Sequence, residues 1–179
     1  MPLPGVLALY AGALAAAAGA GLLYAIALGL LHVSQWMEAH PARARAVGLG
    51  YSLTHLGVVL PALAWTGHLS WSAGLLCAAS TVYSAVSMAH AHWPLQRPAA
   101  VWRWTLGLGV PLAAHAALTR YYRDAQHAWL LHGHAPHVPP PTQPYAEPLQ
   151  VVALIAGLVW VLPVYQWVSE TTQGWSLPS

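Results

Sequence analysis

The chain has 179 residues, of which 58% are hydrophobic and only 6% are charged, and its formal net charge is +2. Soluble domains carry about 25% charged residues, so this composition excludes an ordinary soluble domain, a disordered chain and a nucleic-acid-binding protein. The charged residues lie between the long apolar runs or at their ends, as they do in polytopic membrane proteins. The single cysteine, Cys77, excludes a disulfide framework and a cysteine-based metal site.

Five stretches are long and apolar enough to cross a bilayer, which requires about 20 mostly apolar residues. In chain order they are residues 5–31, 46–67, 71–92, 99–119 and 149–168. We therefore predict an all-α fold in which residues 1–179 form a single membrane domain, a bundle of five transmembrane helices embedded in the lipid bilayer. The connection 120–148 is rich in proline and histidine and predicts an irregular outer loop, opened by a short interfacial helix at residues 121–131.

The arginines predict the orientation of this bundle in the cell membrane. Four of them fall at the connections that follow the first and third predicted helices, and two fall on the opposite side. The two groups are Arg43, Arg45, Arg97 and Arg103, against Arg120 and Arg123. Because arginine-rich connections stay in the cytoplasm, we expect the N-terminus and the loop 120–148 outside and the C-terminus inside.

The first predicted helix carries many small residues, among them Gly12, Ala16, Gly19 and Gly29. Small residues let membrane helices approach closely, so this helix is expected to pack inside the bundle or against a partner, either another membrane protein or a second copy. An equally weighted explanation is the high alanine and glycine usage of a GC-rich genome.

Polar side chains line one face of the second predicted helix and one face of the third. On the second they are Tyr51, Thr54 and His55, and on the third Ser80, Tyr83, Ser84, Ser87 and His90. Polar atoms are costly against lipid, so we expect the two faces to meet or to border a pocket. Simple hydrogen bonding between helices is the alternative, and it suits the serines better than it suits His55.

Three prolines interrupt the predicted helices: Pro61 in the second, Pro111 in the fourth and Pro163 in the fifth. A proline inside a helix removes a backbone donor and tends to kink the helix. His115 lies one turn beyond Pro111, so we include it among the candidate pocket residues. Kinks beside polar faces are compatible with a ligand cavity, although membrane bundles without ligands have them too.

The eleven histidines raise the question of haem b, whose axial ligands come from different helices at a similar depth. His55 lies near the bilayer centre without an obvious partner at its level. His32, His90 and His92 lie near the cytoplasmic face, so a haem would be expected to bind His32 and either His90 or His92. For each histidine taken singly, a structural or interfacial role is the favoured alternative.

The outer loop contains a second group of histidines, of which His132, His134 and His137 could bind a metal ion because imidazole suits Zn, Cu and Ni. Their spacing matches no specific zinc motif, and a polar, proline-rich loop without metal is the favoured reading.

These patterns lead to one functional hypothesis and two alternatives. The leading hypothesis is a membrane subunit with a polar pocket between the second and third helices that serves electron transfer through haem b or quinone. The first alternative is a small transport or lipid-handling protein that uses the same faces, and the second is a non-catalytic accessory subunit. The sequence leaves open the ligand and whether the protein is an enzyme.

Overall fold

The computed structural model describes residues 3–90, 93, 100–134 and 144–172, and within these residues every regular element is a helix. The elements in chain order are α1 (Leu3–Ala39), α2 (Pro41–Thr54), η1 (His55–Val59), α3 (Leu60–Trp65), α4 (Trp71–Ala89), α5 (Ala100–Trp104), η2 (Thr105–Gly109), α6 (Val110–His134), α7 (Pro148–Ile155), η3 (Ala156–Trp160) and α8 (Val161–Thr172). The segments that share a helix run on without a break, so the described residues form five rods. The predicted all-α fold is confirmed.

Each of the segments η1, η2 and η3 is a short π-helix that ends two or three residues before one of the three prolines named above. Leu60 lies directly before Pro61, and Val110 lies directly before Pro111. The backbone N–H of each of these two residues donates to the carbonyl oxygen five residues earlier, where a regular α-helix would bond four residues earlier. A proline has no N–H, and its ring crowds the carbonyl four residues earlier. A widened π turn relieves that conflict and lets the helix continue. The predicted interruptions are therefore confirmed in place, and they take the form of π turns.

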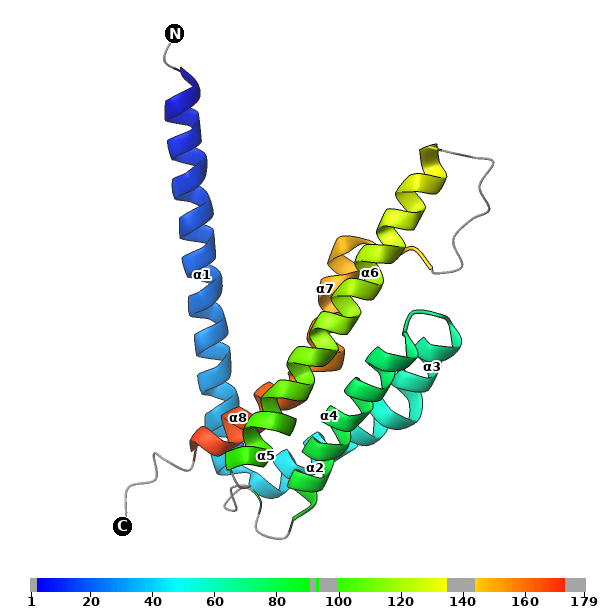
Figure 1. The fold of residues 1–179 in the computed structure, drawn as a ribbon. Helices are drawn as coiled ribbons and strands as arrows, with labels where there is room; N and C mark the ends of the chain where they lie inside the picture. Colours follow the sequence, from blue (N-terminus) through cyan, green and yellow to red (C-terminus); the bar gives the residue numbers. More distant parts are fainter. Residues whose placement is uncertain (1–2, 91–92, 94–99, 135–143, 173–179) are drawn as a thin grey trace.

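Four rods pack together, and α1 stands apart from them over most of its length (Figure 1). None of the most apolar stretch of Ala8–Ala39 is buried inside the protein. Met37, near the end of α1, is buried, and α1 packs chiefly against α8 and α2. The prediction that the first helix packs inside the bundle is wrong for most of its length. The prediction of a partner for this helix is not tested.

Four helices among the described residues are long and apolar enough to cross a membrane, namely Ala8–Ala39, Pro41–Trp65, Trp71–Ala89 and Pro148–Glu170. They correspond to the first, second, third and fifth predicted spans. The fourth predicted span, 99–119, is helical from Ala100 and packs along α4, but it is less apolar than the others. The structure is thus that of a multi-pass membrane bundle, and a fifth crossing by α5–α6 stays a prediction.

α6 continues through the start of the predicted outer loop to His134, and it thus contains the helix predicted at residues 121–131. Its continuation is packed against protein: Tyr122 and Ala125 are buried, and the Tyr122 hydroxyl donates to the His68 carbonyl oxygen at 2.7 Å. The neighbouring Tyr121 hydroxyl donates to the Gly67 carbonyl oxygen. The face that we assigned to an interfacial helix at 121–131 therefore extends the bundle and covers the turn between α3 and α4.

At the opposite end of the bundle, charged side chains tie the helix ends together. Arg45 of α2 donates to the carbonyl oxygen of Ala89 at the end of α4. Arg103 of α5 pairs with Glu170 of α8 at 3.9 Å. The described members of the first arginine group, Arg43, Arg45 and Arg103, do lie at one end, as the orientation argument assumed, while the side of the membrane on which they lie is not tested.

Candidate functional site

His55 is the first residue of η1, and its side chain is almost fully buried, with 2% of its surface exposed. Its Nδ1 atom lies 2.8 Å from the Thr81 hydroxyl oxygen on α4. The polar face of the second predicted helix thus does meet the third, as expected. The residue that makes the contact, Thr81, was not in our predicted set, although it is four residues after Cys77 and three before Ser84 and so shares the face of Ser84.

The hydrogen bonds of Thr81 determine which nitrogen of His55 carries the proton. Thr81 donates its single hydroxyl hydrogen to the Cys77 carbonyl oxygen at 2.8 Å. It therefore accepts from His55, and Nδ1 must carry the proton. Because an unpaired imidazolium is costly in apolar surroundings, the ring is neutral. Its Nε2 atom is then a bare acceptor, and this buried atom has no hydrogen-bond partner among the described residues.

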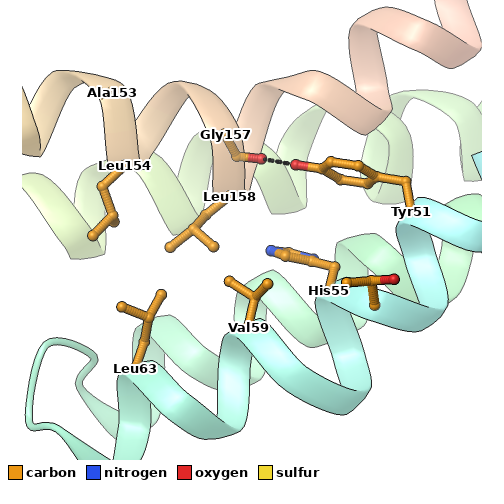
Figure 2. Close-up of a pocket in the computed structure, with 9 residues that line it drawn as sticks. Tyr51, His55, Val59, Leu63, Ala153, Leu154, Gly157 and Leu158 are labelled. Atoms are coloured by element: carbon orange, nitrogen blue, oxygen red, sulfur yellow. Dashed lines mark hydrogen bonds between the residues drawn. The ribbon is translucent and has the colours of Figure 1, made fainter.

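The unpaired side of His55 borders a cavity of about 320 Å³ between the second and fifth rods. We call this cavity the His55 groove. Its lining residues are Tyr51, Thr54, His55, Val59, Leu63, Ala153, Leu154, Gly157 and Leu158. Figure 2 shows the imidazole lying across the gap, with a ring nitrogen directed toward the space between the aliphatic side chains of Val59 and Leu158. The groove is therefore apolar except at the His55 end.

Tyr51 closes that end of the groove. Its ring stacks on the His55 imidazole, with centroids 5.9 Å apart and planes at 23°. Its hydroxyl donates to the Gly157 carbonyl oxygen on the opposite wall at 2.7 Å (Figure 2). Tyr51 thus joins α2 to η3 above the imidazole, and its own hydrogen is already used.

Both walls of the groove include a π turn, since His55 and Val59 belong to η1 and Gly157 and Leu158 to η3. Single π turns are frequent at functional sites because they displace side chains and backbone groups from the regular helical positions. The prolines that produce these turns were visible in the sequence. Their consequence for the groove was not, because it depends on two π turns facing each other.

The structure brings together only part of the predicted pocket. Tyr51, Thr54 and His55 line the groove, but its other wall is α7–η3 and not the third predicted helix. The remaining candidates, Tyr83, Ser84, Ser87 and His115, are not among the lining residues. The groove found at Tyr51, Thr54 and His55 thus lies between the second and fifth predicted helices, and a pocket between the second and third stays a prediction.

The other candidate residues lie elsewhere in the bundle. Ser84 is buried, and Ser87 accepts a hydrogen bond from the Gln166 amide at 3.0 Å. The Tyr83 ring lies 3.5 Å from the point at which a Cβ on Gly107 would be placed, and the buried hydroxyl of Tyr83 has no hydrogen-bond partner among the described residues. His115 accepts from the indole N–H of Trp160 at 3.2 Å. This contact pairs Trp160, near the middle of the predicted span 149–168, with a histidine of the fourth predicted span.

The histidines proposed for haem are not brought together among the described residues. His32 lies on α1 and His90 at the end of α4, and both side chains are exposed. His92 lies outside the described residues. The predicted pairing required α1 to pack on α4, whereas α1 packs chiefly against α8 and α2. Haem binding gains no support from this arrangement and stays a prediction.

The predicted metal site falls partly outside the described residues. His132 and His134 lie in the last turn of α6, and His137 is beyond the described part of this segment. Within the described part of the chain, no group of three histidine, cysteine or acidic side chains could hold a metal ion. The three-histidine site is therefore not tested.

Comparisons with known protein families, curated proteins and solved structures found no match to this chain.

Proposed function

We propose that the protein binds a small lipophilic molecule taken from the bilayer, and that the His55 groove is the binding site. The observation that carries this proposal is the buried Nε2 acceptor of His55 at the end of an otherwise apolar cavity. Ligand sites are typically apolar hollows with a few polar groups that orient the ligand. An ionisable residue inside a membrane span is by default a candidate functional residue.

The position of the groove supports a ligand that arrives through the lipid. Two of its lining residues, Thr54 and Ala153, are exposed, and Tyr51 is 37% exposed, so the cavity opens on the outer surface of the bundle. His55 is 14 residues after Pro41 and 10 before Trp65, the ends of its span. At a rise of about 1.5 Å per residue, it lies near the middle of the span. Because the groove opens on the outer surface of the bundle, a ligand dissolved in the hydrocarbon can enter it directly at that depth.

This proposal belongs to the transport and lipid-handling alternative, and it also accommodates the quinone form of the electron-transfer hypothesis, since quinones are lipophilic. Haem b is a distinct prediction, because no second histidine lines the groove. A visible absorption spectrum of the purified protein separates the two. We expect no Soret band; a Soret band that disappears in His55→Leu would instead assign the groove to haem.

Two glycines provide a matched pair of variants to test the groove. Gly157 lines the groove and lies in η3, whereas Gly57 lies in η1 and does not line it. An added Cβ meets nothing within 4 Å at either position. We expect Gly157→Leu to fill the groove and abolish binding of a simple lipophile such as para-octylanisole, and Gly57→Leu to retain it. Binding is counted by native mass spectrometry of protein released from micelles. Equal binding in both variants would contradict the proposal.

We also propose the orientation that the arginines predict, with the N-terminus outside and the C-terminus in the cytoplasm. Cysteine accessibility in a Cys77→Ala background tests it, since Cys77 is buried and its replacement leaves no native thiol. Ser34→Cys should react with a membrane-impermeant reagent only from the cytoplasmic side, and Thr142→Cys only from outside. The reverse pattern would overturn the orientation and leave the groove proposal unaffected.

A further inference from the structure

We infer that the His55 groove selects ligands whose polar end is a hydroxyl donor, such as a long-chain alcohol, a phenol or a quinol, over the ether, ketone or quinone of the same shape. This inference rests on the proposed function and specifies its ligand. The juxtaposition that carries it is a bare Nε2 acceptor facing an apolar groove while Nδ1–H is held by Thr81.

The polar atoms at the closed end of the groove favour a donor. His55 Nε2 can only accept, because the ring proton is on Nδ1. The Tyr51 hydroxyl donates its only hydrogen to the Gly157 carbonyl oxygen, so it can offer a ligand no donor. The carbonyl oxygen of Gly157 is also an acceptor. The Thr54 hydroxyl can donate or accept and so does not discriminate. A ligand hydroxyl that reaches Nε2 would satisfy the one buried polar atom at this end that lacks a partner.

A ligand that carries only acceptors meets an unfavourable arrangement in the same place. Its oxygen lone pairs would face the Nε2 lone pair, and both groups would be buried without a hydrogen bond. A neutral hydrogen bond contributes about 0.5–1.5 kcal/mol net, which corresponds to a preference of roughly twofold to tenfold for the hydroxyl form. The preference therefore comes from pairing and not from shape.

The depth of His55 restricts the ligand further. A hydroxyl that bonds Nε2 lies near the middle of the span, and the rest of the ligand lies against Val59, Leu63, Leu154 and Leu158. Phospholipid head groups stay at the membrane surface because of their charge and size. A single small hydroxyl loses much less hydration than a charged head group, and a hydrogen bond to Nε2 offsets that loss. The site thus fits neutral lipophilic alcohols and phenols.

A competition between two probes tests the selectivity. Para-octylphenol and its methyl ether, para-octylanisole, differ by the presence of the hydroxyl donor, and neither requires a redox partner. Offered at equal concentration, we expect the phenol to occupy the wild-type protein about two to ten times more often, as counted by native mass spectrometry. His55→Leu should bind both probes with equal preference, because it replaces the Nε2 acceptor with an apolar side chain.

Thr81→Val tests whether the tautomer of His55 sets the preference for the phenol. If Thr81 only stabilised the fold, its loss would not change that preference. Without Thr81 the imidazole proton is no longer held on Nδ1, so Nε2–H can form and donate to an ether oxygen. We expect the preference for the phenol to fall to about parity or to reverse, with total binding retained. Ser80→Ala is the matched control, since Ser80 is also buried on α4 but does not line the groove or bond His55 in the structure.

The outcomes separate this inference from the proposed function. If the wild-type protein binds both probes equally, and Gly157→Leu binds neither, the groove is a lipophile site without hydroxyl selectivity and this inference is wrong. If the wild-type protein binds neither probe, the proposed function itself fails. If the phenol preference persists in His55→Leu, another acceptor provides it and the assignment to Nε2 is overturned.

Discussion

The two sides of α2–η1 are packed in opposite ways. Toward α4 and α8 the helix presents Gly48 and Ser52, both fully covered, and an added Cβ on Gly48 would overlap the Met88 sulfur and lie 3.1 Å from the Tyr165 ring. Toward α7–η3 it presents the His55 groove, where an added Cβ on Gly157 would meet nothing within 4 Å. One face of the helix is filled to contact, and the other borders open space.

The difference shows how one polar residue serves two interfaces. On the tight side, the Nδ1–H of His55 is paired with Thr81, and this interface fixes the tautomer and the ring position. On the open side, the Nε2 atom has no partner among the described residues. The hydrogen bond to Thr81 in the close-packed interface therefore orients the imidazole, whose Nε2 atom is available to a ligand in the groove. In histidine-containing metal sites, a hydrogen bond to the second ring nitrogen orients the ring in the same way.

The largest expected effect comes from filling the tight side. Gly48→Ala should lower the free energy of unfolding by about 1–3 kcal/mol, because Met88 is fully buried and cannot move aside freely. Gly157→Ala should change it by less than about 1 kcal/mol, and in the stabilising direction, because alanine favours helix over glycine. Denaturant unfolding in micelles measures both. Equal losses would show that the two sides are not packed differently.

A comparable effect is expected from separating His55 and Thr81. Thr81→Val should cost about 1–3 kcal/mol in the wild-type background, because it leaves the buried imidazole N–H without a protein acceptor on either ring nitrogen. In a His55→Leu background the same change should cost much less, since no donor is left unpaired. A double-mutant cycle gives the coupling. Additive losses would mean that the hydrogen bond contributes nothing to stability and would weaken the tautomer argument.

The smallest effects should come from two tyrosines that bond backbone carbonyls on the two sides of α2. Tyr165 donates to the Ala44 carbonyl oxygen at 2.7 Å on the tight side, and Tyr51 donates to Gly157 on the groove side. Replacing either by phenylalanine should cost about 1 kcal/mol of stability. Only Tyr51→Phe should also alter occupancy of the groove by para-octylphenol. A change in occupancy with Tyr165→Phe as well would argue for a general loosening of the bundle.

A further prediction concerns the part of α6 beyond the fourth predicted span. Burial raises the pKa of Tyr122 to about 12, so its hydroxyl stays protonated and donates to the His68 carbonyl oxygen at neutral and moderately alkaline pH. Tyr122→Phe should therefore lower the free energy of unfolding by about 1 kcal/mol. Tyr145→Phe, at an exposed site near α7, is the control and should have little effect. No loss in Tyr122→Phe would show that this end of α6 adds nothing to the bundle.

The sequence by itself determined the helices and the membrane class, because both follow from local composition. The apolar runs predicted each rod, and Pro61, Pro111 and Pro163 marked where each of three rods departs from regular α-helix. The sequence also predicted a helix at 121–131, but it did not show that this helix continues the preceding span and packs against the bundle. Tyr121 and Tyr122 bond to the turn between α3 and α4, a contact that is remote in the sequence.

The tertiary structure alone decided which helix faces which. Periodicity placed Tyr51, Thr54 and His55 on one side of a helix, yet it could not show that this side lies between α4 and η3 and bonds to both. Close contact at Gly48 brings α2 against α4, whereas residues of the π turns η1 and η3 line the groove between the second and fifth rods. Apolar character depends on composition along the chain, whereas a cavity depends on the fit between surfaces that the chain brings together only by folding.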